Sequence, residues 1–129
     1  MKNMMPVATV VAMLCGFGAA SETRADSFRT GSRFSPTCKY SHVLTPPWRA
    51  LELPIAGGRV CNSTSSRAEV QYVTKHKSHY ETSYDEALTA AGYVKDRCSD
   101  LSCTYKNGSD KVTVQVIETR NWVTVIARK

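Results

Sequence analysis

The sequence lacks several motifs that would assign a chemistry at once. It contains no glycine-rich phosphate loop, so nucleotide binding of that kind is not indicated. It has no internal repeat of 20 residues or more, which excludes a solenoid or a propeller. Its five cysteines form no C-x2-C pair, the spacing typical of structural zinc. The remaining evidence is composition, periodicity and the spacing of the cysteines.

The chain is short and moderately basic. It has 129 residues, 42% of them hydrophobic, with 17 Lys and Arg against 11 Asp and Glu. A length below about 150 residues predicts one folded domain, which excludes a two-domain enzyme. A net charge of +6 favours solubility and some attraction to polyanions, but it does not determine the fold.

The N-terminus has the layout of a secretory signal peptide. Lys2 precedes an apolar run that ends in small residues, the order typical of such a peptide. Cleavage after Ala20 or after Ala25 fits this layout, and Ala25 is favoured, so residues 1–25 are assigned to the signal peptide. The apolar run is shorter than the roughly 20 residues that span a bilayer, so we expect no stable membrane span after cleavage. We therefore predict a secreted or periplasmic protein.

Four cysteines remain after cleavage, because Cys15 lies in the signal peptide. An even number of cysteines in a small exported chain predicts disulfide bonds. Three pairings are possible. We favour two bridges that each close within one segment, Cys38 with Cys61 and Cys98 with Cys103.

The mature chain divides into a leader and one domain. Residues 26–37 are rich in serine, threonine and arginine and contain few large apolar groups, which predicts a flexible leader. Residues 38–129 form the single disulfide-braced domain. Between its first two cysteines, prolines and the Gly57-Gly58 pair predict turns, with one short edge strand over residues 48–53.

One helix and several strands are predicted in the rest of the domain. Ser83 and Glu86 match a capping box, and Gly92 is a helix stop, which together predict a helix of about 8 residues. Asn107-Gly108 predicts a hairpin turn. Alternation of apolar and polar residues predicts strands near residues 68–74, 93–94, 102–106, 112–116 and 122–126. We expect an α+β domain of two layers, with one short helix packed on an antiparallel sheet of about four to five strands.

The segment Lys75-His76-Lys77-Ser78-His79 concentrates basic groups in a predicted loop. An H-x-x-H spacing can bind a metal ion from a helix, but the flanking lysines repel a cation. Ammonium groups and partly protonated imidazoles favour phosphate or sulfate instead. No metal and no cofactor is therefore assigned to the chain.

Arg120 and Trp122 pair a basic with an aromatic side chain before the last strand. Such pairs can anchor a protein interface. Because Thr124 and Ile126 alternate on the same face as Trp122, we expect this face to belong to the core rather than to a stacking platform. The candidate binding residues are Lys75, His76, Lys77, His79, Arg120 and Trp122.

No arrangement of residues indicates catalysis. A small secreted ribonuclease needs a base, an acid and a cation that stabilises the phosphorane. The chain contains these residue types, but at no spacing that indicates an active site, so no catalytic residue is assigned. The residues that supply the types are His42, His76, His79, Glu81, Glu118 and Arg120.

These observations favour an exported, non-enzymatic binding module of the accessory or inhibitor type. Its expected partner is another protein in the periplasm or outside the cell. Two alternatives stay open, a basic protein that binds an anionic polymer and a small secreted hydrolase. Salt separates the first two readings, because binding to a polyanion weakens by decades as salt rises.

Overall fold

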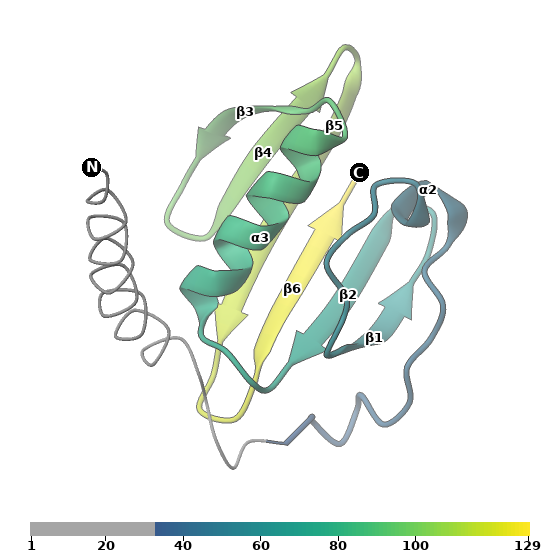
Figure 1. Cartoon of the computed structure of the whole chain (residues 1–129), viewed down its shortest axis with the longest axis vertical. Helices are drawn as coiled ribbons and strands as arrows, with labels where there is room; N and C mark the ends of the chain where they lie inside the picture. The colour runs from purple at the N-terminus through teal and green to yellow at the C-terminus, as the bar shows by residue number, and fades with distance from the viewer. Residues whose placement is uncertain (1–32) are drawn as a thin grey trace, which may run out of the picture.

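The computed structural model describes residues 33–129, so the predicted signal peptide and residues 26–32 of the predicted leader lie outside the described residues (Figure 1). Within this range the chain forms two helices and six strands. Their order is α2 (Pro46–Arg49), β1 (Gly58–Ser63), β2 (Arg67–Tyr72), α3 (Lys77–Ala90), β3 (Val94–Cys98), β4 (Ser102–Asn107), β5 (Asp110–Glu118) and β6 (Val123–Arg128).

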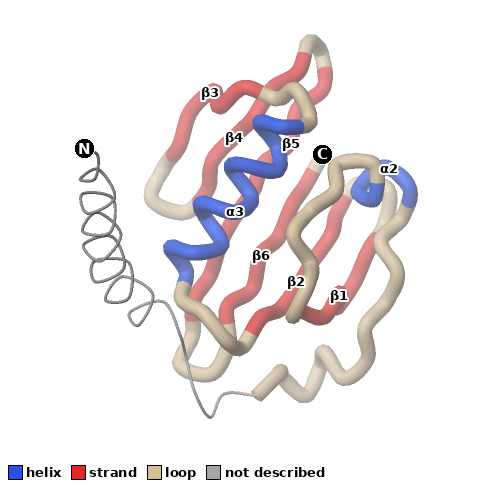
Figure 2. Tube along the Cα trace, in the orientation of Figure 1, coloured by secondary structure: helices blue, strands red, loops and turns tan. Residues whose placement is uncertain are grey.

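The strands form one antiparallel sheet in the order β1-β2-β6-β5-β4-β3, and α3 packs on one of its faces (Figure 2). The prediction of an α+β domain is confirmed, but the sheet has six strands and not four to five. The missed strand is β1. A register shift between Val60 and Asn62 interrupts the period of two on which strand prediction depends.

The core lies between α3 and the sheet. α3 buries Tyr80, Tyr84 and Leu88, which are four residues apart and therefore share one helix face. Each large apolar side chain that is fully buried contributes about 1.5–3 kcal/mol to folding. The sheet residues of this core are Val60, Ala68, Val70, Tyr72, Tyr105, Val112, Val114, Val116, Val123, Val125 and Ala127.

The core face of β6 is the opposite of the predicted one. Val123, Val125 and Ala127 face α3, whereas Thr124 and Ile126 lie on the far face. The alternation of apolar and polar residues did not identify the core face, because β6 is a central strand and five of its six residues are buried. Both faces of such a strand are shielded from water.

α3 is longer than predicted and begins earlier. It has 14 residues with His76 as the N-cap, so the second half of the segment 75–79 is helix rather than loop. The predicted cap, Ser83, lies inside the helix, where its Oγ donates to the carbonyl of His79 at 2.9 Å. The predicted stop is confirmed, because Gly92 follows the helix with a φ of 95°.

The predicted strand over residues 48–53 is wrong, because helix α2 occupies the start of that stretch. Pro46 and Pro47 stand at its first positions, where a missing N–H does no harm. Trp48 is 0% exposed, and its Nε1 donates to the carbonyl of Thr64 at 2.7 Å. This indole therefore fixes α2 against the loop between β1 and β2.

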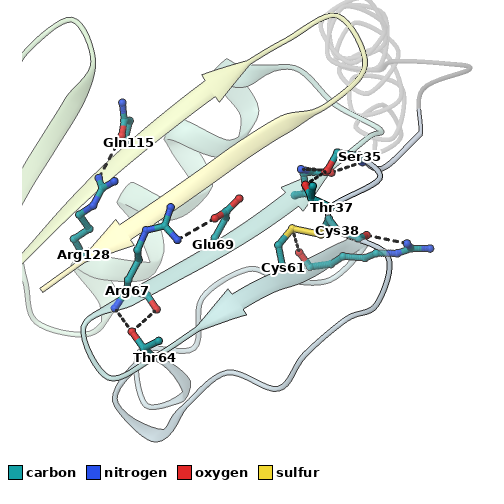
Figure 3. A network of polar contacts seen from close by, with 11 residues as sticks. Ser35, Thr37, Cys38, Cys61, Thr64, Arg67, Glu69, Gln115 and Arg128 are labelled. Carbon is teal, nitrogen blue, oxygen red and sulfur yellow. Dashed lines mark hydrogen bonds and ion pairs between the residues drawn. A yellow bond between two sulfur atoms is a disulfide. The ribbon is translucent and has the colours of Figure 1, made fainter.

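Both predicted disulfides are confirmed, Cys38–Cys61 and Cys98–Cys103. The first holds the segment that precedes it against the far face of the sheet (Figure 3). Ser35 is buried there, since its amide donates to Gln71 Oε1 at 2.7 Å and Gln71 Nε2 donates to Ser35 Oγ at 3.1 Å. Residues 33–37 were assigned to the flexible leader from the sequence, but at least one of them, Ser35, packs on β2.

The two disulfides should differ in their contribution to stability. Cys38 and Cys61 are 23 residues apart, whereas Cys98 and Cys103 are 5 apart. The loop-closure model gives about 3 kcal/mol for the longer loop and about 2 kcal/mol for the shorter one. In urea unfolding, the double substitution Cys38→Ala with Cys61→Ala should lower the free energy of unfolding more than Cys98→Ala with Cys103→Ala. The reverse order would contradict this account.

Candidate functional site

The structure brings the two predicted groups of binding residues to one end of the sheet. His76 lies between β2 and α3, and its Nδ1 is 2.8 Å from Oε2 of Glu118 at the end of β5. This contact joins the segment 75–79 to the turn that carries Arg120 and Trp122. The β2–α3 connection and the β5–β6 turn therefore form one surface.

Glu118 also determines where α3 begins. Its Oε1 accepts the backbone amide of Lys77 at 3.1 Å, one of the amides that a helix start leaves without a partner. A carboxylate at this position also interacts favourably with the helix dipole. Because Glu118 is 41 residues away from Lys77 in the sequence, no local pattern could reveal this cap.

The surroundings of His79 disfavour its protonation. Its ring lies edge-on to the Tyr80 ring, with centroids 4.9 Å apart. Burial, and secondly the charge of Lys75, lowers the pKa of His79 below its usual value of 6.5, although Glu86 opposes this. His79 is therefore neutral near pH 7, which weakens the reading of this segment as an anion site.

A tyrosine cluster lies beneath this surface. The rings of Tyr72 and Tyr80 stack with centroids 3.9 Å apart, and the hydroxyls of Tyr72 and Tyr84 are 2.6 Å apart. Burial raises the pKa of Tyr72 and of Tyr84 well above 10, so both hydroxyls stay protonated. The stacked and hydrogen-bonded rings hold α3 against the sheet.

Of the residues considered for a ribonuclease, the structure brings His76 and Glu118 into contact but does not connect His42 to them. His42 lies beside β1, where its amide donates to the carbonyl of Val60 at 2.9 Å. Among the described residues, no hydrogen bond or ion pair connects His42 to His76 or His79. Within residues 33–129, no group of three or more His, Cys, Asp or Glu could hold a metal ion.

A hollow lined by both polar and apolar residues adjoins this surface beside the β3–β4 loop. It has a volume of about 50 Å³, with Glu81 of α3 on one side and Leu101 of the loop on the other. Glu81 is 3.9 Å from Lys77 Nζ, so the hollow lies one helical turn from the basic segment. Val114 and Val116 contribute to its lining from the sheet. Sequence reasoning missed this site, although Leu101 between two bridged cysteines was the available signal.

The two edges of the sheet differ. All five residues of β3 are exposed, and β3 pairs only with β4. At the other edge, Arg59 Nη1 donates to the carbonyls of Cys38 and Lys39 at 3.1 and 2.7 Å, so the chain before α2 covers β1. Of the described edges, β3 is thus the accessible one.

Asp85 anchors the accessible edge to α3. Its Oδ1 is 3.1 Å from Lys95 Nζ of β3 and accepts the hydroxyl of Tyr105 of β4 at 2.9 Å. Partial burial alone would raise the pKa of Asp85, but the hydrogen bonds from Lys95 and Tyr105 outweigh it and lower the pKa. An ionised Asp85 therefore holds β3 and β4 in place.

Comparisons with known proteins give no family assignment, because no family model, no curated protein and no solved structure matches the chain. No helix of the described residues is long and apolar enough to cross a membrane. The surface must therefore be interpreted from its own chemistry.

We predict that Glu118 stabilises the start of α3. Glu118→Ala should lower the free energy of unfolding by about 1 kcal/mol, the usual effect of losing a helix cap, as measured by urea unfolding followed by circular dichroism. Glu118→Gln is the matched control, because its amide oxygen can still accept the Lys77 amide. Equal losses in the two variants would show that the cap does not act through this bond.

We also predict a pH dependence from His79. Because its pKa is lower in the folded chain than the 6.5 of an unperturbed histidine, the folded state binds fewer protons, and stability is lost as the pH falls below 6.5. Between pH 7 and pH 5, His79→Gln should lose less stability than the wild-type chain in urea unfolding. His42→Gln, at an exposed position beside β1, is the control for loss of a histidine side chain, and an equal change in both variants would contradict the prediction.

Proposed function

We propose that the chain is an exported, non-enzymatic binding module of the accessory or inhibitor type that engages another protein through the β3 edge. The observation that carries this proposal is the contrast between the exposed β3 edge and the covered β1 edge. Two disulfides, typical of proteins that fold in an oxidising compartment, support the export part of the proposal.

An exposed edge strand offers unpaired backbone N–H and C=O groups to another chain. A partner that presents an extended segment can add to such an edge as a further strand, with its main chain providing affinity. The β1 edge cannot accept an added strand in this way, because the chain before α2 covers it and is held there by hydrogen bonds from Arg59.

Exposed apolar side chains at both ends of β3 support a role of this edge in protein binding. Val94 at its start is 71% exposed, and Leu101 just after it is 70% exposed. The adjacent hollow of about 50 Å³ suits one small apolar side chain of the added segment. Specificity would come from this side chain, since backbone bonds are common to all sequences.

The edge is held rigid before a partner arrives. Cys98–Cys103 closes the hairpin at one end, and Asp85 ties Lys95 to α3. A surface that is already ordered loses less conformational entropy on binding. In this proposal the predicted binding residues form the outer part of the interface, where the cations among them affect the rate of association more than the affinity. They are Lys75, His76, Lys77, His79, Arg120 and Trp122.

The test uses the mature, oxidised chain to capture partners from the envelope and culture fluid of the source cells. The captured protein is then titrated against two double variants by calorimetry. Val94→Asp with Leu101→Asp should weaken binding at least tenfold, because it replaces the exposed apolar side chains at both ends of β3 with charges, and Leu101 lines the hollow. Tyr40→Asp with Val43→Asp is the matched control, since these side chains are 74% and 75% exposed elsewhere on the molecule.

Absence of a stoichiometric partner, or an equal loss in the control variant, would overturn the proposal. Circular dichroism and non-reducing electrophoresis establish that each variant is folded and oxidised.

A further inference from the structure

The face of the sheet opposite α3 carries a row of basic and hydroxyl side chains. Arg67 of β2 stands directly opposite Arg128 of β6, which stands opposite Thr113 of β5. Thr104 of β4 and Arg97 of β3 continue the same row. The row crosses five strands, a distance of about 19 Å at the usual spacing of strands.

Two lysines extend the row along the strands. Lys106 of β4 stands directly opposite Lys111 of β5, two residues from Thr104 and Thr113. Tyr105 lies between Thr104 and Lys106, and Val112 lies between Lys111 and Thr113. Because Tyr105 and Val112 face the core, both lysines lie on the far face with the threonines. We refer to Arg67, Arg97, Lys106, Lys111 and Arg128 as the basic face.

The basic face contains like charges at directly opposed positions. Such pairs destabilise a sheet, whereas opposite charges at the same positions stabilise it. Here the pattern occurs twice on one face, at Arg67 with Arg128 and at Lys106 with Lys111. The excess of positive charge on this face favours an anionic ligand.

Only part of this charge is neutralised within the chain. Glu69 pairs with Arg67 at 3.0 Å, and Asp96 pairs with Lys106 at 3.4 Å. Arg128 donates to the neutral amide of Gln115 at 3.3 Å (Figure 3). In the part of the chain that the structure describes, Arg97 and Lys111 have no acidic partner. Three of the five cations thus lack an opposite charge there.

Neutral polar groups lie between these cations. A hollow of about 380 Å³ is lined by Thr104, Arg97 and Lys111, together with the ion pair of Asp96 and Lys106. The hydroxyls of Thr104 and Thr113 are 3.4 Å apart. Such groups suit the hydroxyls of a sugar. The far-face positions of β4, β5 and β6 hold no aromatic residue on which a nucleic-acid base could stack.

We propose that the basic face binds an acidic polysaccharide, a linear chain of sulfated or carboxylated sugars that crosses the strands along the row. Arg97, Lys111 and Arg128 contact its anionic groups, and Thr104 and Thr113 contact its hydroxyls. Leu101 lies outside this site, whereas Val94 stands opposite Lys106 at its border, and the site does not depend on a protein partner.

The test titrates the mature, oxidised chain with heparin oligosaccharides by calorimetry at increasing salt. Binding should weaken about 40-fold between 50 and 200 mM salt, as counterion release predicts for three ionic contacts. Arg97→Glu with Lys111→Glu should bind at least tenfold more weakly. Lys39→Glu with Arg49→Glu is the matched control, because it changes the net charge equally at exposed positions outside the basic face.

Parallel titrations identify the class of polymer. Polygalacturonate measures the carboxylated class, and single-stranded oligo(dT) of equal charge measures the phosphate backbone of nucleic acids. Tighter binding of either polysaccharide than of oligo(dT) supports the proposal. Oligo(dT) bound as tightly or more tightly overturns it, and so does an equal loss of affinity in the control variant.

Folding and the two surfaces are separated by further variants. Arg97→Gln with Lys111→Gln replaces the two charges with neutral polar groups and should also weaken heparin binding. This variant takes the place of Arg97→Glu with Lys111→Glu if the latter folds poorly. Leu101→Asp alone, in the β3–β4 loop outside the basic face, should retain heparin binding, so loss of the protein partner and loss of the polysaccharide are distinct results.

Discussion

The insertion of β6 between β2 and β5 is the constraint on which the rest of the structure depends. Without this C-terminal strand, the β1–β2 hairpin and the strands β3–β5 would be two small sheets with no common core. Pairing with β6 also places Glu118 opposite Val123, at the end of the sheet where α3 begins. The helix cap, the core and the alignment of the far face all follow from the position of one strand.

Both proposed surfaces meet at β3, because a strand at the edge contributes to an edge and to a face at once. The backbone of β3 offers the outer row of hydrogen-bonding groups, while the side chain of Arg97 belongs to the basic face. A segment added to β3 would extend the sheet by one strand and place its own side chains beside Arg97. An acidic residue there would compete with a polysaccharide, and a basic residue would lengthen its site.

Local patterns predicted the features that depend on neighbouring residues. The helix stop at Gly92, the hairpin at Gly108 and the two short-range disulfides could all be read from the sequence. Features that depend on residues far apart in the sequence could not be predicted in this way. The capping box at Ser83 was a correct motif in the wrong place, because Glu118 supplies a cap that is closer to the true start. The strand predicted at Trp48 failed because a tertiary contact with Thr64 holds a proline-led helix there.

Charge shows the same division between local and distant order. The segment 75–79 attracts attention because its basic residues are consecutive, yet His79 is kept neutral and the carboxylate of Glu118 faces His76. The residues of the basic face are separated by long stretches of sequence, and only the strand register brings them into one row. A sheet can therefore assemble a site for a linear polymer from single cations that no local window would detect, because strand spacing converts distant positions into regular neighbours.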